Sequence, residues 1–198
     1  MAENENISKT NFRANSKARP VVNMSVPTLK NRYNGKNVLI ENIFIGIDTG
    51  VHTGFAVWSA TRQMFIDWGE TKIHRAMFRV LRYAQHQDRY RILGVRVEDA
   101  RKRSVDKNNP IYRQRLQSAG SVKRDASVWE DFLKDYRKYF QYQMVAPQAN
   151  FTKLPEEEFA RRFGLVISSD HVRDACMLVA NLENKPMLSD SAYNRNKE

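Results

Sequence analysis

The chain has 198 residues, 41% of them hydrophobic, which is enough for one sizeable core and argues against two independent domains. Its 33 Lys and Arg residues against 22 Asp and Glu residues give a formal net charge of +11, which favours a polyanionic partner such as nucleic acid. Cys176 is the only cysteine, which excludes an intrachain disulfide, and no apolar stretch approaches the roughly 18 residues of a membrane span. We therefore expect a soluble intracellular protein.

The first segment, residues 1–37, is rich in Asn, Ser, Lys and Arg and has almost no periodic apolar positions. This composition predicts a flexible basic N-terminal arm, either one that helps to hold DNA phosphates or a merely solvated tail. We expect residues 38–185 to form the folded domain and residues 186–198 to form a polar C-terminal tail.

Apolar runs and periodicities predict an α/β fold with a mixed five-stranded sheet, in which an antiparallel meander of three strands is joined to two parallel strands and flanked by helices. Between the fourth strand and the second helix, residues 99–120 are predicted to form a long exposed basic loop. The expected elements, in chain order, are strands at 43–47, 55–58 and 64–68, a helix at 73–87, a strand at 91–97, a helix at 121–139, a strand at 142–145, a short helix after Pro155 and a last helix at 171–181, capped by Ser169 or Asp170.

Three acidic residues stand where predicted strands or helices meet the edge of this sheet. Asp48 follows one buried run and Glu98 follows another. Asp174 lies three residues after His171 on the last helix, so these two side chains share a helix face. Several carboxylates held close together repel one another, and a pair of divalent cations offsets that repulsion while supporting phosphodiester cleavage. The pattern therefore predicts a two-metal site.

Each of these residues also has an ordinary interpretation. An Asp after a strand is usually a turn residue, and a Glu at that position is usually solvated. A His in the first turn of a helix needs no function. The prediction of a metal site depends on their joint occurrence in one order of strands and helices.

The segment Ile45–Val57, Ile-Gly-Ile-Asp-Thr-Gly-Val-His-Thr-Gly-Phe-Ala-Val, resembles the opening strand-turn-strand of RuvC-type Holliday junction resolvases, members of the RNase H-like superfamily. Val95-Arg96-Val97-Glu98 is similar to their second acidic strand, and His171-Val172-Arg173-Asp174-Ala175 to their C-terminal metal-binding helix. The resemblance covers residues from about 43 to 182.

This resemblance implies catalytic metal ligands at Asp48, Glu98, His171 and Asp174, which would hold two Mg²⁺ or Mn²⁺ ions. Asp170 is a rival ligand because it lies four residues before Asp174, but His171 has the matching spacing and Asp170 is left as the helix cap. The family often carries an aromatic wedge three residues after the Glu, where this chain has Arg101. Either Tyr112 replaces the wedge or the wedge is absent.

The function implied is a metal-dependent endonuclease that resolves four-way DNA junctions by paired nicks, acting as a homodimer because a two-fold junction suits a two-fold enzyme. The basic arm and the expanded loop indicate a phage, viral or organellar relative, placed in a bacterial or phage-infected cytoplasm or in an organelle such as the chloroplast nucleoid. Alternatives are another RNase H-like nuclease acting on flap, branched or RNA–DNA hybrid substrates, and a non-catalytic nucleic-acid binding protein of this fold. Residues expected to contact DNA are Arg101, Lys102, Arg103, Lys107, Tyr112, Lys123 and Arg124.

Overall fold

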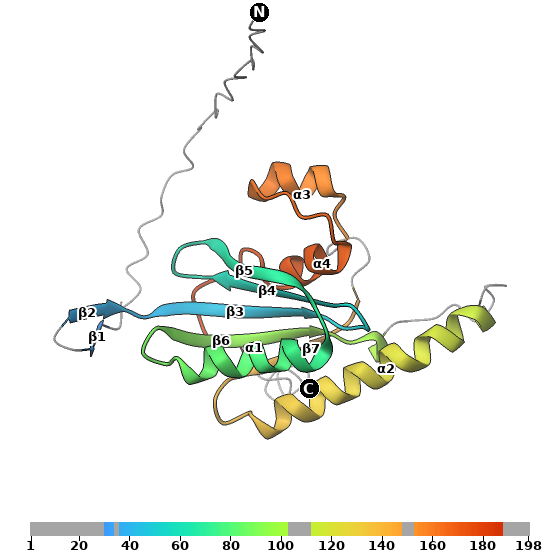
Figure 1. Ribbon diagram of the computed structural model, residues 1–198, viewed down its shortest axis with the longest axis horizontal. Helices are drawn as coiled ribbons and strands as arrows, with labels where there is room; N and C mark the ends of the chain where they lie inside the picture. Colours follow the sequence, from blue (N-terminus) through green and yellow to red (C-terminus); the bar gives the residue numbers. More distant parts are fainter. Residues whose placement is uncertain (1–29, 34–35, 103–111, 148–152, 188–198) are drawn as a thin grey trace, which may run out of the picture.

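The computed structural model describes residues 30–33, 36–102, 112–147 and 153–187, which form a mixed β-sheet with helices on both of its faces (Figure 1). The sheet has the strand order β5-β4-β3-β6-β7, with β3 in the centre. Two further strands, β1 and β2, form a small hairpin of their own. The elements are β1 (Lys30–Tyr33), β2 (Lys36–Leu39), β3 (Glu41–Asp48), β4 (Thr53–Ser59), β5 (Met64–Thr71), α1 (Ile73–Gln85), β6 (Tyr90–Glu98), the 3-10 turn η1 (Ala100–Lys102), α2 (Tyr112–Asp135), β7 (Tyr142–Val145), α3 (Glu156–Phe163) and α4 (Asp170–Val179).

The predicted sheet is confirmed strand by strand. β3, β4 and β5 form the antiparallel meander, while β6 runs parallel to β3 and β7 parallel to β6. α1 makes the crossover between β5 and β6, as its helical spacing of apolar residues predicted. Because β3, β6 and β7 run in one direction, their carboxyl ends meet at the same edge of the sheet.

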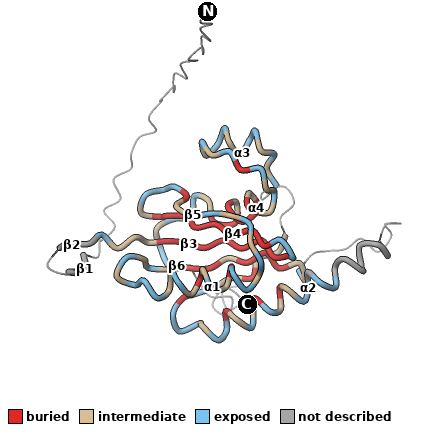
Figure 2. The backbone as a smooth tube through the Cα atoms, in the orientation of Figure 1, coloured by how far each residue is buried: buried red, intermediate tan, exposed pale blue. Residues whose placement is uncertain are grey.

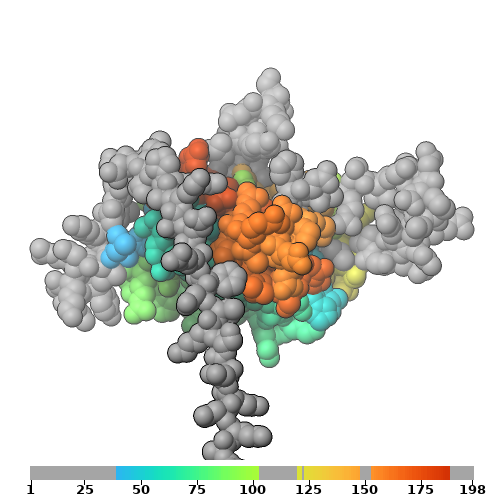
Figure 3. All heavy atoms as spheres, turned by 90° about the horizontal axis from the view of Figure 1, so that it is seen from above, coloured from blue at the N-terminus to red at the C-terminus, as the bar shows by residue number. Residues whose placement is uncertain are grey.

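The helices divide into two layers, each with its own apolar core. On one face, α1 and α2 pack against the sheet around Val80 and the fully buried Trp129. On the other face, α4 and α3 pack around Cys176 and Phe159. Figure 2 shows buried residues concentrated along the central strands between these layers. Seen from above, in Figure 3, the orange atoms of the α3 region stand on the face that also carries α4.

The second helix differs from its prediction, because α2 begins at Tyr112 rather than at residue 121 and ends at Asp135 rather than at residue 139. Much of the segment expected to be an exposed basic loop is therefore helical. Its residues Gln114, Arg115 and Leu116 are good helix formers, and a high density of positive charge does not prevent a helix. Residues 103–111 of that predicted loop lie outside the described residues.

The hairpin of β1 and β2 lies in and just after the segment predicted as a flexible arm, whose residues 1–29 are outside the described ones. Among the helices that the structure describes, none is long and apolar enough to cross a membrane.

Candidate metal centre

Asp48 and Glu98 end two neighbouring parallel strands and project to the same face of the sheet. Side chains alternate between the two faces along a strand. On β3, Ile47 packs in the core beneath α1 and α2, so the next residue, Asp48, faces α4. On β6, Val97 packs in that same core, so Glu98 also faces α4. The two-residue period of the strands therefore brings both carboxylates to one place.

Asp174 reaches this place because α4 lies directly on the sheet. A Cβ atom at Gly46 of β3 would lie 2.1 Å from the carbonyl oxygen of Ala175, and one at Gly54 of β4 would lie 1.9 Å from that of His171. Both distances are far shorter than any atomic contact allows. Because Gly46 and Gly54 have no side chains, α4 can approach the sheet closely enough for Asp174 to meet the strand carboxylates.

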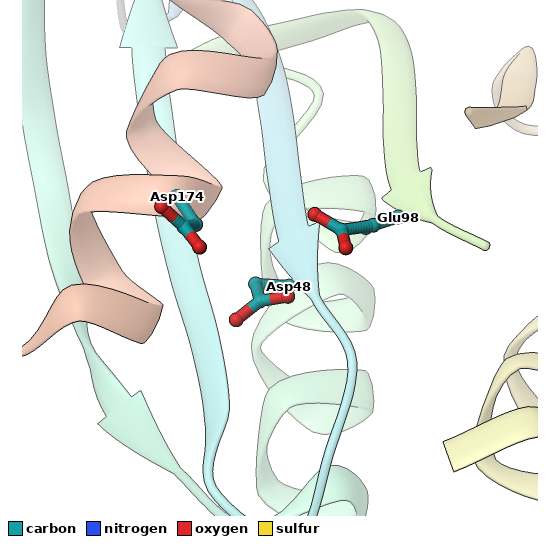
Figure 4. Close-up of side chains that lie close together, drawn as sticks. All are labelled: Asp48, Glu98 and Asp174. Atoms are coloured by element: carbon teal, nitrogen blue, oxygen red, sulfur yellow. The ribbon is translucent and has the colours of Figure 1, made fainter. Parts of the chain in front are cut away.

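The three carboxylates form one compact cluster, drawn in Figure 4. Asp48, Glu98 and Asp174 each offer an oxygen atom within 4.8 Å of the other two. Their exposed fractions are only 7%, 5% and 3%, respectively. In the part of the chain that the structure describes, this is the one group of three or more acidic, His or Cys side chains close enough to share a metal ion.

The cluster is electrostatically unfavourable without a cation. Two carboxylates about 4 Å apart repel by roughly 4 kcal/mol at an effective dielectric constant of 20. Burial, and after it the negative charge of Glu98, raise the pKa of Asp48 from 3.8 to about 7, although a hydrogen bond from His171 opposes the shift. The Asp48 carboxyl therefore holds its proton to a much higher pH than an ordinary Asp, unless a positive charge binds beside it.

The donors present fit a hard divalent cation. All three are carboxylates, the ligands that Mg²⁺ and Mn²⁺ prefer, and they come from three separate elements, so that they surround a point rather than line a surface. The ammonium group of Lys153 contacts Asp174 and supplies one compensating positive charge to the cluster.

His171 lies beside the cluster and contacts one of its members. Its Nδ1 atom is 2.8 Å from Oδ2 of Asp48. Burial alone would lower the pKa of His171, but the hydrogen bond and the charge of Asp48 outweigh it and raise that pKa. In this arrangement His171 orients the Asp48 carboxylate, and its predicted role as a direct metal ligand stays a prediction.

The beginning of α4 corrects one expectation about Asp170. Ser169 is the N-cap, since its hydroxyl oxygen accepts a hydrogen bond from the Val172 amide at 3.4 Å, whereas Asp170 is the first residue of the helix. The exposed Asp170 carboxylate accepts from the amide of His171 and is not a member of the cluster. Glu70 of β5 accepts the Ser169 hydroxyl at 2.7 Å, which ties the start of α4 to the meander.

Sequence analysis missed Lys153, a cation in direct contact with the cluster. Its Nζ atom lies 2.6 Å from Oδ2 of Asp174, although the side chain remains 53% exposed. Lys153 stands outside any helix or strand, and no periodicity or spacing distinguishes it from the other basic residues. Only the packing of the chain before α3 against α4 reveals it.

Arg101, expected to contact DNA or to occupy the position of the wedge, has internal partners. Its guanidinium donates to both oxygens of Asp99, at 2.7 and 2.8 Å, and forms an ion pair with Glu130 of α2 at 2.7 Å. These contacts raise the pKa of Arg101 and join η1 to α2. Its positive charge is therefore largely neutralised by two acids of the protein itself.

The other residues expected to contact DNA have different surroundings. Lys102 donates to the carbonyl oxygen of Met144 on β7. Lys123 and Arg124 are exposed on α2, as a phosphate contact requires. Arg103 and Lys107 lie outside the described residues, as does the side chain of Tyr112, whose backbone begins α2.

Comparison with protein-family models and with curated proteins finds no match to the chain.

Proposed function

We propose that the protein is a metal-dependent DNA endonuclease of the RNase H-like type that cuts four-way junctions. The observation that carries the proposal is the meeting of Asp48, Glu98 and Asp174, from three separate elements, within 4.8 Å of one another. A pair of divalent ions bound there would activate a water molecule and stabilise the leaving oxygen of a phosphodiester. The chain's own contribution is to hold the carboxylates, exclude bulk water from them and orient Asp48 through His171.

The fold and the sequence resemblance support the type of nuclease. A three-stranded meander followed by two parallel strands, with acids at the ends of β3 and β6 and on α4, is the arrangement that the resemblance to RuvC-type resolvases implies. The resemblance and the cluster are separate arguments, because the resemblance rests on short motifs and the cluster rests on distances between residues up to 126 positions apart.

The charge of the chain supports DNA as the substrate. A formal net charge of +11 favours polyanions, and release of counterions from DNA would make binding steeply dependent on salt. Paired nicks in a junction with two-fold symmetry require two active sites, so we propose that the protein cuts junctions as a homodimer.

The decisive experiment compares synthetic four-way junction, duplex, flap and RNA–DNA hybrid of matched sequence, each with Mg²⁺, with Mn²⁺ and with EDTA. We expect junction to be cut fastest, by paired nicks, and EDTA to abolish cutting. Cutting of flap or hybrid in preference to junction would replace the substrate proposal while keeping the metal site. Binding without cutting of any substrate in either metal would contradict the nuclease proposal.

Variants then test the site. Asp48→Asn, Glu98→Gln and Asp174→Asn should each abolish cutting and leave junction binding nearly intact, because each removes a ligand charge and no phosphate-binding cation. Asp170→Ala is the matched control on α4, since its carboxylate is exposed and outside the cluster. Turnover like that of the wild type in any of the three cluster variants would refute the site.

A further inference from the structure

The helix α1 presents a basic outer face. Between Ile73 and Gln85 the helix contains no acidic residue, although a solvated helix ordinarily mixes charges of both signs. In the middle of its outer face Phe78 is 63% exposed, which is unusual for a large apolar side chain. The exposed residues of this face are His74, Arg75, Phe78, Arg82, Gln85 and His86.

The carboxyl end of α1 borders a hollow of about 210 Å³ whose lining has more basic than acidic side chains. One acidic residue lines it, Asp67, and that carboxylate is already bound on both oxygens, by Arg79 at 2.5 Å and by the Tyr83 hydroxyl at 3.0 Å. Arg82, which also lines the hollow, forms no ion pair within the described residues. The remaining basic residues of the lining are His86 and Arg89.

A second hollow of about 430 Å³ adjoins the first, since Tyr90 lines both. Its cations are Arg91, Arg137 and Lys138, and none of the residues that line it is acidic. Tyr139, at 48% exposure, stands beside them, with the Lys138 ammonium 4.9 Å from the centre of its ring. In surfaces that bind nucleic acids, basic side chains follow the phosphate backbone and exposed aromatic rings stack on unpaired bases.

The second hollow lies at the edge of the sheet opposite the carboxylate cluster, and the first extends from Tyr90 at that edge to Asp67 in the middle of β5. Residues of the α1–β6 and α2–β7 connections line the hollows. Figure 1 shows these connections at the end from which β3 and β6 start. Because β3 has eight residues, the two ends of the sheet are about 26 Å apart at about 3.3 Å per residue. That length corresponds to about eight base pairs at 3.4 Å per nucleotide of one strand.

The acidic neighbours do not neutralise this edge. Asp88 lies 4.0 Å from Nδ1 of His86 and 3.9 Å from Nε of Arg89. Because these side chains are exposed and the distances are long, Asp88 offsets only part of the positive charge of Arg89. Asp135 ends α2 nearby and is exposed, but it lines neither hollow. Several arginines and one lysine remain as surplus positive charge.

We propose that this second surface, the basic edge formed by Arg82, Arg89, Arg137 and Lys138, binds the phosphate backbone of DNA, separately from any DNA held at the carboxylate cluster. The proposal goes beyond the nuclease function, because it needs neither a metal ion nor cleavage. An arginine guanidinium can donate two parallel hydrogen bonds to the oxygens of one phosphate group. A neutral partner offers no such charged acceptor, so a cluster of arginines favours a phosphate-bearing partner. In a nuclease with a branched substrate, the basic edge would hold an arm some eight base pairs from the cut.

Anisotropy of labelled duplex and single-stranded DNA, titrated with the full chain in EDTA over a series of salt concentrations, tests the proposal. Arg82→Ala/Arg89→Ala should weaken binding and reduce the slope of log K against log salt by about 0.9 for each phosphate that the protein no longer neutralises. The matched control is Arg161→Ala/Arg162→Ala on α3, which removes the same charge from exposed positions on another face. Thermal melting checks that both double variants fold.

A second readout locates the DNA. Bound DNA should protect Lys138 from acetylation in the wild type, and the Arg82→Ala/Arg89→Ala variant should show no such protection. An unchanged salt slope with an unprotected Lys138 would overturn the proposal, and so would an equal weakening of binding in the control pair. If binding to phosphatidylserine vesicles is lost in the Arg82→Ala/Arg89→Ala variant while DNA binding is unchanged, the basic edge is a membrane-binding surface and the proposal is overturned. All of these measurements are made without metal, so they stand whether or not the chain proves to be a nuclease.

Discussion

In the metal-free protein, Asp48→Asn should make folding less sensitive to pH, because Asp48 is a buried acid beside two others. Its pKa is raised from 3.8 to about 7, first by burial and then by Glu98. A raised native pKa means that the native state binds more protons than the unfolded chain between about pH 4 and about pH 7, so stability falls as pH rises through that window. Above about pH 7 Asp48 is ionised in both states, so its destabilising effect on the native state no longer changes with pH.

The size of the effect follows from the shift. Each pKa unit corresponds to about 1.4 kcal/mol, so between about pH 5 and about pH 8 the wild type should lose about 2.5 kcal/mol of unfolding free energy through Asp48. Asparagine cannot titrate, so the variant should gain that amount relative to the wild type over the same interval. Urea unfolding in EDTA at both pH values measures the difference.

Adding saturating Mn²⁺ should then stabilise the wild type more at the higher pH, where the ligand is ionised, and stabilise Asp48→Asn little at either. The reasoning fails if the relative stability of the two proteins is the same at both pH values, or if Mn²⁺ stabilises them equally. Either result would mean that ionisation of Asp48 does not destabilise the metal-free protein and that Asp48 does not bind the cation.

Three further predictions concern the surroundings of the cluster. Gly54→Ala should lower thermal stability and weaken Mn²⁺ binding together, because the new methyl group collides with the carbonyl of His171 and lifts α4. Gly120→Ala is the control and should leave Mn²⁺ binding unchanged, because its new Cβ meets no atom of the described residues within 4 Å beyond its own helix. A stable Gly54→Ala protein with normal Mn²⁺ affinity would show that α4 adjusts freely. His171→Asp should keep cleavage and move its preference from Mn²⁺ towards Mg²⁺, since imidazole favours Mn²⁺ and oxygen favours Mg²⁺; unchanged metal preference in cleavage assays would place His171 outside the ligands. Lys153→Gln should tighten Mn²⁺ binding in calorimetry by several fold, because its ammonium competes for Asp174, and weaker binding would instead make Lys153 a supporting residue.

Much of the site was accessible from local patterns. A short apolar run bounded by turn residues favours a strand, and a strand that ends in an acid delivers that acid to the edge of the sheet. The crossover helix makes β6 parallel to β3, so the sequence alone predicts Asp48 and Glu98 at one edge. The three-residue spacing of His171 and Asp174 likewise puts both on one side of a helix.

Other features depend on contacts that no local pattern expresses. Whether the basic segment at 112–120 is loop or helix is decided by helix propensity and by its continuity with the rest of α2, and charge density alone pointed the wrong way. Arg101 has the charge of a DNA contact, but Asp99 and Glu130 surround it in the folded protein. Lys153 reaches its place beside Asp174 only through the path of the chain between β7 and α4.

By itself, therefore, the sequence determined the order of strands and helices, the face on which each acid lies and the excess of positive charge, because these follow from periodicities of two and about 3.6 residues and from composition. Tertiary structure decided how closely the three acids meet. That distance depends on α4 resting on Gly46 and Gly54, a contact between backbones with no counterpart in any single segment. It also decided which cations are neutralised by internal acids and which remain at the basic edge, because electrostatic partners are chosen by proximity in space and not along the chain.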